Sequence, residues 1–147
     1  MFNHESPLRP EQFVTQKIIR TLLEISNGNS DHLTLGNIDI YRDWGWAPEY
    51  VQAMCLVNWQ TEPDDFVIAT GESHSLRFFV ELACVALELD FEDCVSTDKA
   101  KFRPNDIRFS KGNPEKARSV LGWTATTKLG DLVQLLLDDY SYRARKN

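Results

Sequence analysis

The chain has 147 residues, a length that suits one modest domain with a single core. Its formal net charge is −6 and no basic run is longer than residues 143–146, which disfavours a broad nucleic-acid-binding face. Three widely spaced cysteines without a CxxC pair disfavour a zinc site and fit a reducing compartment. No apolar run approaches a membrane span. We therefore expect a cytoplasmic protein with no metal site and no nucleic-acid or membrane contact.

The first half of the chain is expected to begin with a polar loop at residues 1–10. Apolar residues at helical spacing then predict a helix at residues 11–26. Residues 32–35 and 38–42 are typical of short strands on either side of a turn. A second helix is expected at residues 47–60, with Pro48 in its first turn. Its Cys55 is expected in the core, as is Cys84 further along the chain.

The second half begins with a continuous apolar run at residues 66–70 that ends at Gly71. This pattern predicts a strand buried on both faces, as in a parallel sheet. Ser75 is expected to cap a helix at residues 76–89, and Asn113 a short helix that ends near Leu121. A last helix is expected at residues 129–140. Together the elements predict a small α/β domain whose helices cover two or three short strands.

The loop at residues 3–9 carries Asn, His, Glu and Ser in succession and an Arg soon after. Side chains of this kind can line a site for a polar ligand or cofactor. A solvated N-terminal tail explains the same composition equally well.

Three cations elsewhere are candidate anion contacts. Asp43 is positioned to orient the guanidinium of Arg42 for a bidentate phosphate contact, although a surface ion pair is the commoner case. Pro104 forces Arg103 into an extended conformation that suits anion capture, although a solvated loop arginine is again commoner. Lys17 borders the apolar stripe of its helix, from which it can reach either water or a bound anion. The sequence has no glycine-rich phosphate loop.

Taken in chain order, these segments resemble the GDP-mannose 4,6-dehydratases, which are extended short-chain dehydrogenase/reductase enzymes. The matching segments cover nearly the whole chain and are NHESP at 3–7, VTQKI at 14–18, LGN at 35–37, RDWG at 42–45, YV at 50–51, DFVIATG at 65–71, FRP at 102–104, GNPEKA at 112–117 and LGW at 121–123. Each motif alone is weak, but their shared order makes chance similarity remote.

The resemblance implies an α/β fold, namely the small helix-rich C-terminal substrate domain of an NAD(P)-binding, Rossmann-type extended short-chain dehydrogenase/reductase whose Rossmann core is missing. Residues 1–147 would form one GDP-sugar-binding domain, with residues 1–10 as the loop from the missing half. No matched segment contains the family's glycine-rich fingerprint, its Thr/Ser–Glu pair or its Tyr-xxx-Lys motif, and the spacing Tyr-xxx-Lys occurs once, at residues 142–146, outside those segments. No catalytic residue is therefore expected on this chain.

The resemblance also implies roles for individual residues. His4 and Arg9 match positions that contact NADP. Substrate contacts are implied for Asn3, Lys17, Arg42, Val67 and Arg103. Among these, Lys17 and the two arginines would converge on the diphosphate, Val67 would flank the guanine or ribose, and Asn3 would contact the substrate from the cofactor loop.

The implied function is that of a fragment or truncated form of a lyase, GDP-mannose 4,6-dehydratase. The intact reaction would oxidise C4 of GDP-mannose, eliminate water across C5–C6 and return the hydride to C6, giving GDP-4-keto-6-deoxymannose. This chain would bind GDP-mannose or a related GDP-sugar, would be inactive alone, and would form a homo-oligomer or associate with a Rossmann-containing chain. Two alternatives remain open: a non-catalytic binding or regulatory module that docks on a full-length enzyme, and part of a related nucleotide-sugar reductase or epimerase.

Overall fold

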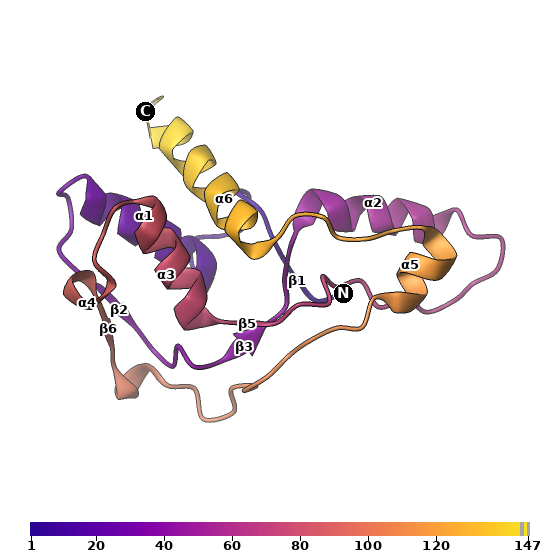
Figure 1. The fold of residues 1–147 in the computed structure, drawn as a ribbon, viewed down its shortest axis with the longest axis horizontal. Coiled ribbons are helices and arrows are strands. Elements are labelled where there is room, and N and C mark those ends of the chain that lie inside the picture. Colours follow the sequence, from indigo (N-terminus) through magenta and orange to yellow (C-terminus); the bar gives the residue numbers. More distant parts are fainter. Residues whose placement is uncertain (145, 147) are drawn as a thin grey trace.

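The computed structural model of the protein describes residues 1–144 and 146 (Figure 1). The elements in chain order are β1 (Asn3–Glu5), α1 (Val14–Ser26), β2 (Leu33–Leu35), β3 (Tyr41–Arg42), β4 (Trp44–Trp46), α2 (Ala47–Asn58), β5 (His74–Ser75), α3 (Leu76–Ala86), α4 (Phe91–Cys94), β6 (Val95–Thr97), the 3-10 helix η1 (Lys99–Lys101), α5 (Glu115–Leu121) and α6 (Leu129–Ala144).

The strands of the described residues form three two-stranded sheets. β1 and β4 are parallel, with Asn3 opposite Trp44, and β2 and β6 are parallel, with Leu33 opposite Val95. β3 and β5 are antiparallel. The prediction of two or three strands was too low, because strands of two or three residues are too short to show a period in the sequence.

Helices α1, α3 and α6 pack around the larger hydrophobic core, at the end of the molecule that also carries α4 and the β2–β6 pair (Figure 1). Ile18, Phe79 and Leu132 are fully buried there. The predicted helices are confirmed, although α1 begins at Val14 and α6 continues to Ala144. The Phe78 amide donates to Ser75 Oγ at 3.1 Å, which confirms the predicted cap of α3.

A smaller core joins α2 and α5 at the other end of the molecule (Figure 1). Tyr50 of α2 is fully buried, and its ring meets the Trp123 ring edge-on with 5.7 Å between the centroids. Trp123 Nε1 donates to the Glu49 carbonyl at 2.9 Å. Gly122 ends α5 with φ of 65°, a left-handed conformation that glycine adopts without strain. The predicted core position of Cys55 on α2 was wrong, because this residue is exposed, whereas Cys84 is buried as expected.

Asp43, between β3 and β4, joins three distant segments. Its Oδ1 accepts hydrogen bonds from the Thr70 amide at 2.9 Å and the Thr70 hydroxyl at 2.7 Å. Its Oδ2 accepts from the amides of Gly71 at 3.1 Å and Gly112 at 3.2 Å. A Cβ atom on Gly112 would lie 2.2 Å from that of Ala69, so only glycine fits this junction.

The predicted strand at residues 66–70, buried on both faces, was wrong. The segment belongs to no strand among the described residues, and Val67 is 42% exposed, although Ile68 and Ala69 are buried. The Phe2 amide, beside β1, donates to the Ile68 carbonyl at 2.9 Å. The segment therefore lies beside β1 on one side and has no strand partner on the other.

Candidate functional site

His4, the first predicted cofactor contact, is fixed by neighbours on two sides. Its Nδ1 lies 2.9 Å from the Phe2 carbonyl, and its ring stacks on Tyr50 with centroids 5.4 Å apart. Because a carbonyl oxygen only accepts, Nδ1 carries the proton and Nε2 of the neutral ring remains an acceptor. Gly45 makes this stack possible, since a Cβ there would lie 2.2 Å from the Tyr50 ring.

Arg9, the second predicted cofactor contact, is held by the same loop. Its Nη1 donates to the His4 carbonyl at 3.0 Å, and its guanidinium lies 4.0 Å above the Phe13 ring. Its Nε is 3.4 Å from Glu5 Oε2, yet it is buried without a hydrogen-bond partner within the described part of the chain. The guanidinium is therefore oriented by contacts within the chain itself.

Glu5 forms the buried base of this loop, with only 1% of its surface exposed. Burial raises the pKa of its carboxyl, and a hydrogen bond from the Thr15 hydroxyl at 2.6 Å and the charges of Arg9 and His4 partly oppose that rise. Gln16 Nε2 adds a second tie from α1 to the loop, at 2.9 Å from the Ser6 carbonyl. The sequence reasoning assigned no role to Glu5, Thr15 or Gln16, although all three lie within the matched NHESP and VTQKI segments.

A hollow of about 410 Å³ lies beside Arg9, between this loop, α1 and the end of α6. Arg9, Gln16, Tyr140 and Arg143 are among the residues that line it. Arg143 is paired with Asp139 on its own helix. The oriented guanidinium of Arg9 suits the phosphate oxygens of a nucleotide cofactor, and His4 Nε2 suits a hydroxyl or amide donor. The loop thus offers one cation and one acceptor nitrogen to a polar ligand, and the described residues contain no glycine-rich turn that could hold a pyrophosphate.

The predicted substrate residues occupy separate places in the fold. Asn3 lies half-buried on β1, within the cofactor loop, whereas Val67 lies exposed on the segment beside β1. Lys17 projects from α1, and its Nζ donates to the Thr34 carbonyl at 3.1 Å. Lys101 Nζ lies 3.5 Å from the same oxygen, so two ammonium groups meet at Thr34 in the middle of β2.

Arg42 is the most strongly engaged of the predicted substrate residues. Its Nη2 donates to Asp106 Oδ1 at 2.7 Å, and its Nη1 donates to the carbonyls of Tyr41 and Ile107. The predicted orienting role of Asp43 was wrong, because Asp43 binds the amides of the Thr70–Gly71 turn and Gly112 instead. Successive side chains of an extended chain point to opposite faces, which separates Asp43 from the Arg42 guanidinium.

Arg103 lies exposed three residues before Asp106, and its carbonyl accepts from the Asp106 amide at 3.3 Å. Asp106 therefore links Arg42 and Arg103, one through its side chain and the other through its main chain. The sequence reasoning assigned no role to Asp106. No hydrogen bond or ion pair in the described part of the chain joins Lys17 directly to either arginine.

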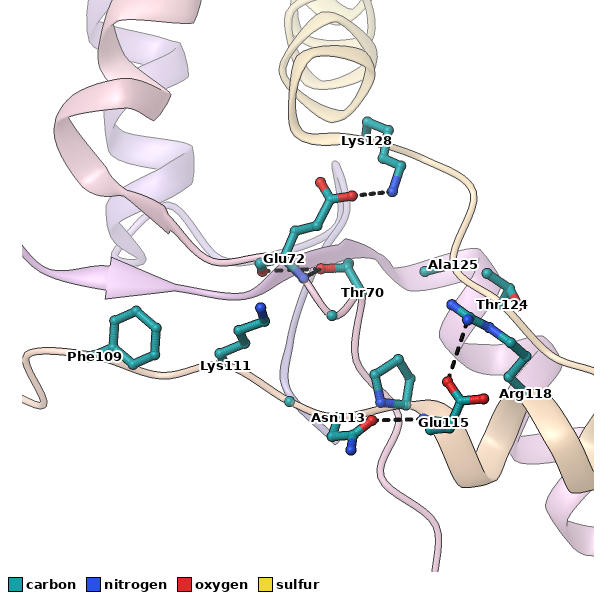
Figure 2. A pocket seen from close by; sticks show the side chains of 13 residues that line it. Thr70, Glu72, Phe109, Lys111, Asn113, Glu115, Arg118, Thr124, Ala125 and Lys128 are labelled. Atoms are coloured by element: carbon teal, nitrogen blue, oxygen red, sulfur yellow. Dashed lines mark hydrogen bonds and ion pairs between the residues drawn. The ribbon is translucent and has the colours of Figure 1, made fainter.

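Another hollow, of about 670 Å³, lies elsewhere and is lined by none of the seven predicted site residues. Figure 2 shows three cations around it, of which Lys128 binds Glu72 and Arg118 lies 3.4 Å from Glu115. The third, Lys111, faces the same space. Two of the three cations are paired with carboxylates, so this open groove has no strong preference for an anion. We therefore do not assign the ligand site to this groove.

Two further findings bound the chemistry. Over residues 1–144 and 146, no group of three or more His, Cys, Asp or Glu side chains is arranged to hold a metal ion. In the same residues no helix is long and apolar enough to cross a membrane.

The fold is that of the extended short-chain dehydrogenase/reductases. RMD from Pseudomonas aeruginosa, solved with NADPH, superposes with a TM-score of 0.86 at 20% identity, over 96% of this chain and 46% of that chain. The dTDP-glucose 4,6-dehydratase of Bacillus anthracis, solved with NAD, superposes with a TM-score of 0.82 at 17% identity, over 98% of this chain and 44% of that chain. At these identities the likeness shows the fold alone, and it confirms a partial, helix-rich domain of this class.

The sequence comparisons are more specific. The profile of the GDP-mannose 4,6 dehydratase family matches residues 1–136. GDP-mannose 4,6 dehydratase 1 of Arabidopsis thaliana is 44% identical over 139 residues, covering 95% of this chain and 38% of that protein. The Homo sapiens GDP-mannose 4,6 dehydratase is 39% identical over 151 residues, covering 91% of this chain and 41% of that protein. The chain therefore belongs to the GDP-mannose 4,6-dehydratase family, which confirms the resemblance, and it spans less than half the length of these relatives.

Proposed function

We propose that residues 1–147 form a single GDP-sugar-binding unit, the C-terminal portion of a GDP-mannose 4,6-dehydratase acting in the cytoplasm. Lys17, Arg42 and Arg103 would bind the diphosphate of GDP-mannose, with Asn3 and Val67 contacting the rest of the ligand. The observation that carries this proposal is the loop at residues 3–9. Glu5 is buried and accepts a hydrogen bond from the Thr15 hydroxyl of α1, which fixes the loop against the helix and supplies the preorganisation that a binding wall needs.

His4 and Arg9 would form the cofactor side of this wall. NADP, when bound, supplies the site that accepts a hydride from C4 of the sugar and later returns it to C6. Within this chain, Arg9 offers a fixed cation for a phosphate group and His4 an acceptor nitrogen. The resemblance assigns no proton-transferring role to any residue of the matched segments, so we place those roles on the partner. The chain alone is therefore expected to bind ligand without turnover.

A second, Rossmann-containing chain or segment is the partner we propose. Val51 and Met54 of α2 are 53% and 42% exposed, and Trp59 just after the helix is 74% exposed. The segment at residues 66–70 adds an extended, apolar edge with Phe2 bonded on one side only. Uncovered apolar surface of this kind is typical of a face that packs against another protein segment. We call α2 and residues 66–70 together the α2 face.

The activity of the pair tests this proposal. The purified chain would be mixed with GDP-mannose and NADP, with and without the separately expressed N-terminal half of a family relative. We expect 4-keto-6-deoxy product only from the mixture. Product from the chain alone would overturn the proposal that this chain binds ligand without turnover. A mixture that gives neither product nor association would overturn the proposed Rossmann-containing partner.

Matched variants test the α2 face. Val51→Asp is expected to weaken association with the N-terminal half at least tenfold, because a charge would replace an apolar contact. Val85→Asp, at a 76% exposed position of α3 away from this face, is the control and should leave association unchanged. Binding to a full-length relative without any product in the mixture would instead favour a docking module, and a different sugar product would favour a reductase or epimerase.

A further inference from the structure

Residues 98–112, here called the strap, connect β6 to α5 and cross β3 on the way (Figure 1). At its start, the Asp98 amide donates to the Leu35 carbonyl at 2.8 Å. The main chain of Lys101 then passes so close to Gly36 that a Cβ there would lie 2.7 Å from the Lys101 carbonyl oxygen. Residues 99–105, including Arg103, are exposed. The hydrogen bonds of this exposed part are local turns within the strap itself, except for the weak contact of Lys101 with Thr34.

The second half of the strap is attached to β3 by two consecutive residues. Tyr41 binds the strap through its main chain. Its amide donates to the Arg108 carbonyl at 2.8 Å, and its carbonyl accepts from the Ser110 amide at 3.1 Å. Arg42 binds the strap through its guanidinium, which donates to the Asp106 carboxylate and the Ile107 carbonyl. The side chains of Arg42 and Asp106 are only 15% and 23% exposed. This ion pair is therefore partly desolvated and stronger than a surface pair.

The same guanidinium is a proposed contact of the ligand's diphosphate. Carboxylate and phosphate oxygens bind a guanidinium fork with the same geometry. Asp106 thus occupies the place that a phosphate oxygen would take. The Asp106 amide donates to the Arg103 carbonyl at 3.3 Å, so Asp106 and Arg103 belong to one turn of the strap.

We propose that Asp106 is an internal anion that latches the strap onto Arg42, and that a diphosphate ligand displaces it and frees Arg103 to close over the ligand. The latch rests on the proposed function, because it takes Arg42 and Arg103 as the diphosphate contacts. The latch couples ligand binding to movement of the strap. It also assigns Asp106 a positioning role that acts through Arg42, without requiring it to touch the ligand.

Hydrogen exchange in the intact 147-residue chain tests the latch without any ligand. Asp106→Asn is expected to speed amide exchange in residues 99–107 by about tenfold, because one partly buried charged hydrogen bond is removed. Exchange in α1, α3 and α6 should not change. Asp93→Asn, at an exposed acid on α4, is the control. Arg42→Lys keeps the charge but loses the fork, and it should release the strap as Asp106→Asn does. Unchanged strap exchange in both variants would overturn the latch.

Pyrophosphate titration tests the competition, with ionic strength held constant by sodium chloride. Pyrophosphate should speed strap exchange in the wild-type chain and should bind Asp106→Asn several-fold more tightly, because the internal competitor is gone. Weaker or equal binding by Asp106→Asn, or no binding by either chain, would overturn the competition. A different measurement tests the proposed function, namely GDP-mannose binding to the pair formed by this chain and the N-terminal half of a relative. No binding there would overturn the proposed function, independently of how the strap behaves in the chain alone.

Discussion

Replacing Asp43 with Asn is expected to destabilise the fold strongly, because this one carboxylate joins three segments. It is only 1% exposed and accepts from four donors: the amide and hydroxyl of Thr70 and the amides of Gly71 and Gly112. These contacts tie β3 and β4 to the end of the segment at residues 66–70 and to the end of the strap. The smaller core and the larger core therefore meet through Asp43.

The expected loss of stability follows from the hydrogen bonds that each of the two Asp43 carboxylate oxygens accepts. An Asn side chain keeps one oxygen for Thr70 and places an NH₂ group where Oδ2 accepted from Gly71 and Gly112. Two main-chain donors then lose their acceptor, and each such loss costs about 1–3 kcal/mol when the donor is buried. The total, about 2–6 kcal/mol, is a large part of the stability of an ordinary domain, which is about 5–15 kcal/mol.

Urea unfolding followed by tryptophan fluorescence measures this loss, because Trp44 and Trp123 are buried in different cores. Asp31→Asn is the matched control, since Asp31 is exposed and should leave the free energy of unfolding unchanged. A value for Asp43→Asn within about 0.5 kcal/mol of the wild type would refute the assignment of Asp43 as the joint between the cores.

Three further changes have expected outcomes that the same unfolding assay measures. Tyr50→Phe should leave stability unchanged or raise it by up to about 2 kcal/mol, because the Tyr50 hydroxyl is buried without a partner among the described residues; a loss would show that the hydroxyl is satisfied. Glu5 has a raised pKa in the folded state because of its burial, so its contribution to stability is fully present below the unfolded value near 4.5 and is lost as pH rises through the raised pKa. The free energy of unfolding relative to Glu5→Gln should therefore fall as pH rises above about 4.5, and a constant difference would contradict this. Gly45→Ala should cost at least about 1–3 kcal/mol through its clash with Tyr50, whereas Gly130→Ala on α6, where a Cβ meets nothing within 4 Å, should stabilise by up to about 1 kcal/mol; equal effects would contradict the packing at Gly45.

The helices and one cap could be predicted from the sequence because their signals are local. The apolar stripe of α1 and the Ser75 cap of α3 each depend on residues within one or two turns. The segment at residues 66–70 could not, because a continuous apolar run predicts burial but does not show whether the covering strands belong to the same chain. The same reason accounts for α2, whose Val51, Met54 and Cys55 are exposed despite an apolar sequence.

The individual site contacts were harder to predict because they join residues far apart in the chain. Arg42 and Asp106 are 64 positions apart, and Asp43 and Gly112 are 69 apart. The RDWG motif places Arg42 and Asp43 side by side, which suggested that they bind each other. The structure instead directs one to the strap and the other to the joint between the cores. The role of each of two neighbouring charged residues therefore depends on the distant residue that it contacts in the folded chain.

The two walls of the candidate site are held in physically different ways. The cofactor loop is fixed by buried groups: Glu5 is 1% exposed, and the His4 ring is stacked on a fully buried Tyr50. The strap is fixed at its centre by an ion pair whose partner, Asp106, an incoming diphosphate can replace. Under the proposed function, a ligand would meet a cofactor wall that does not need to rearrange and a substrate wall that does. From this difference it follows that the conformational cost of binding a GDP-sugar falls on the strap, so variants of Asp106 should change GDP-sugar affinity while leaving the geometry of His4 and Arg9 intact.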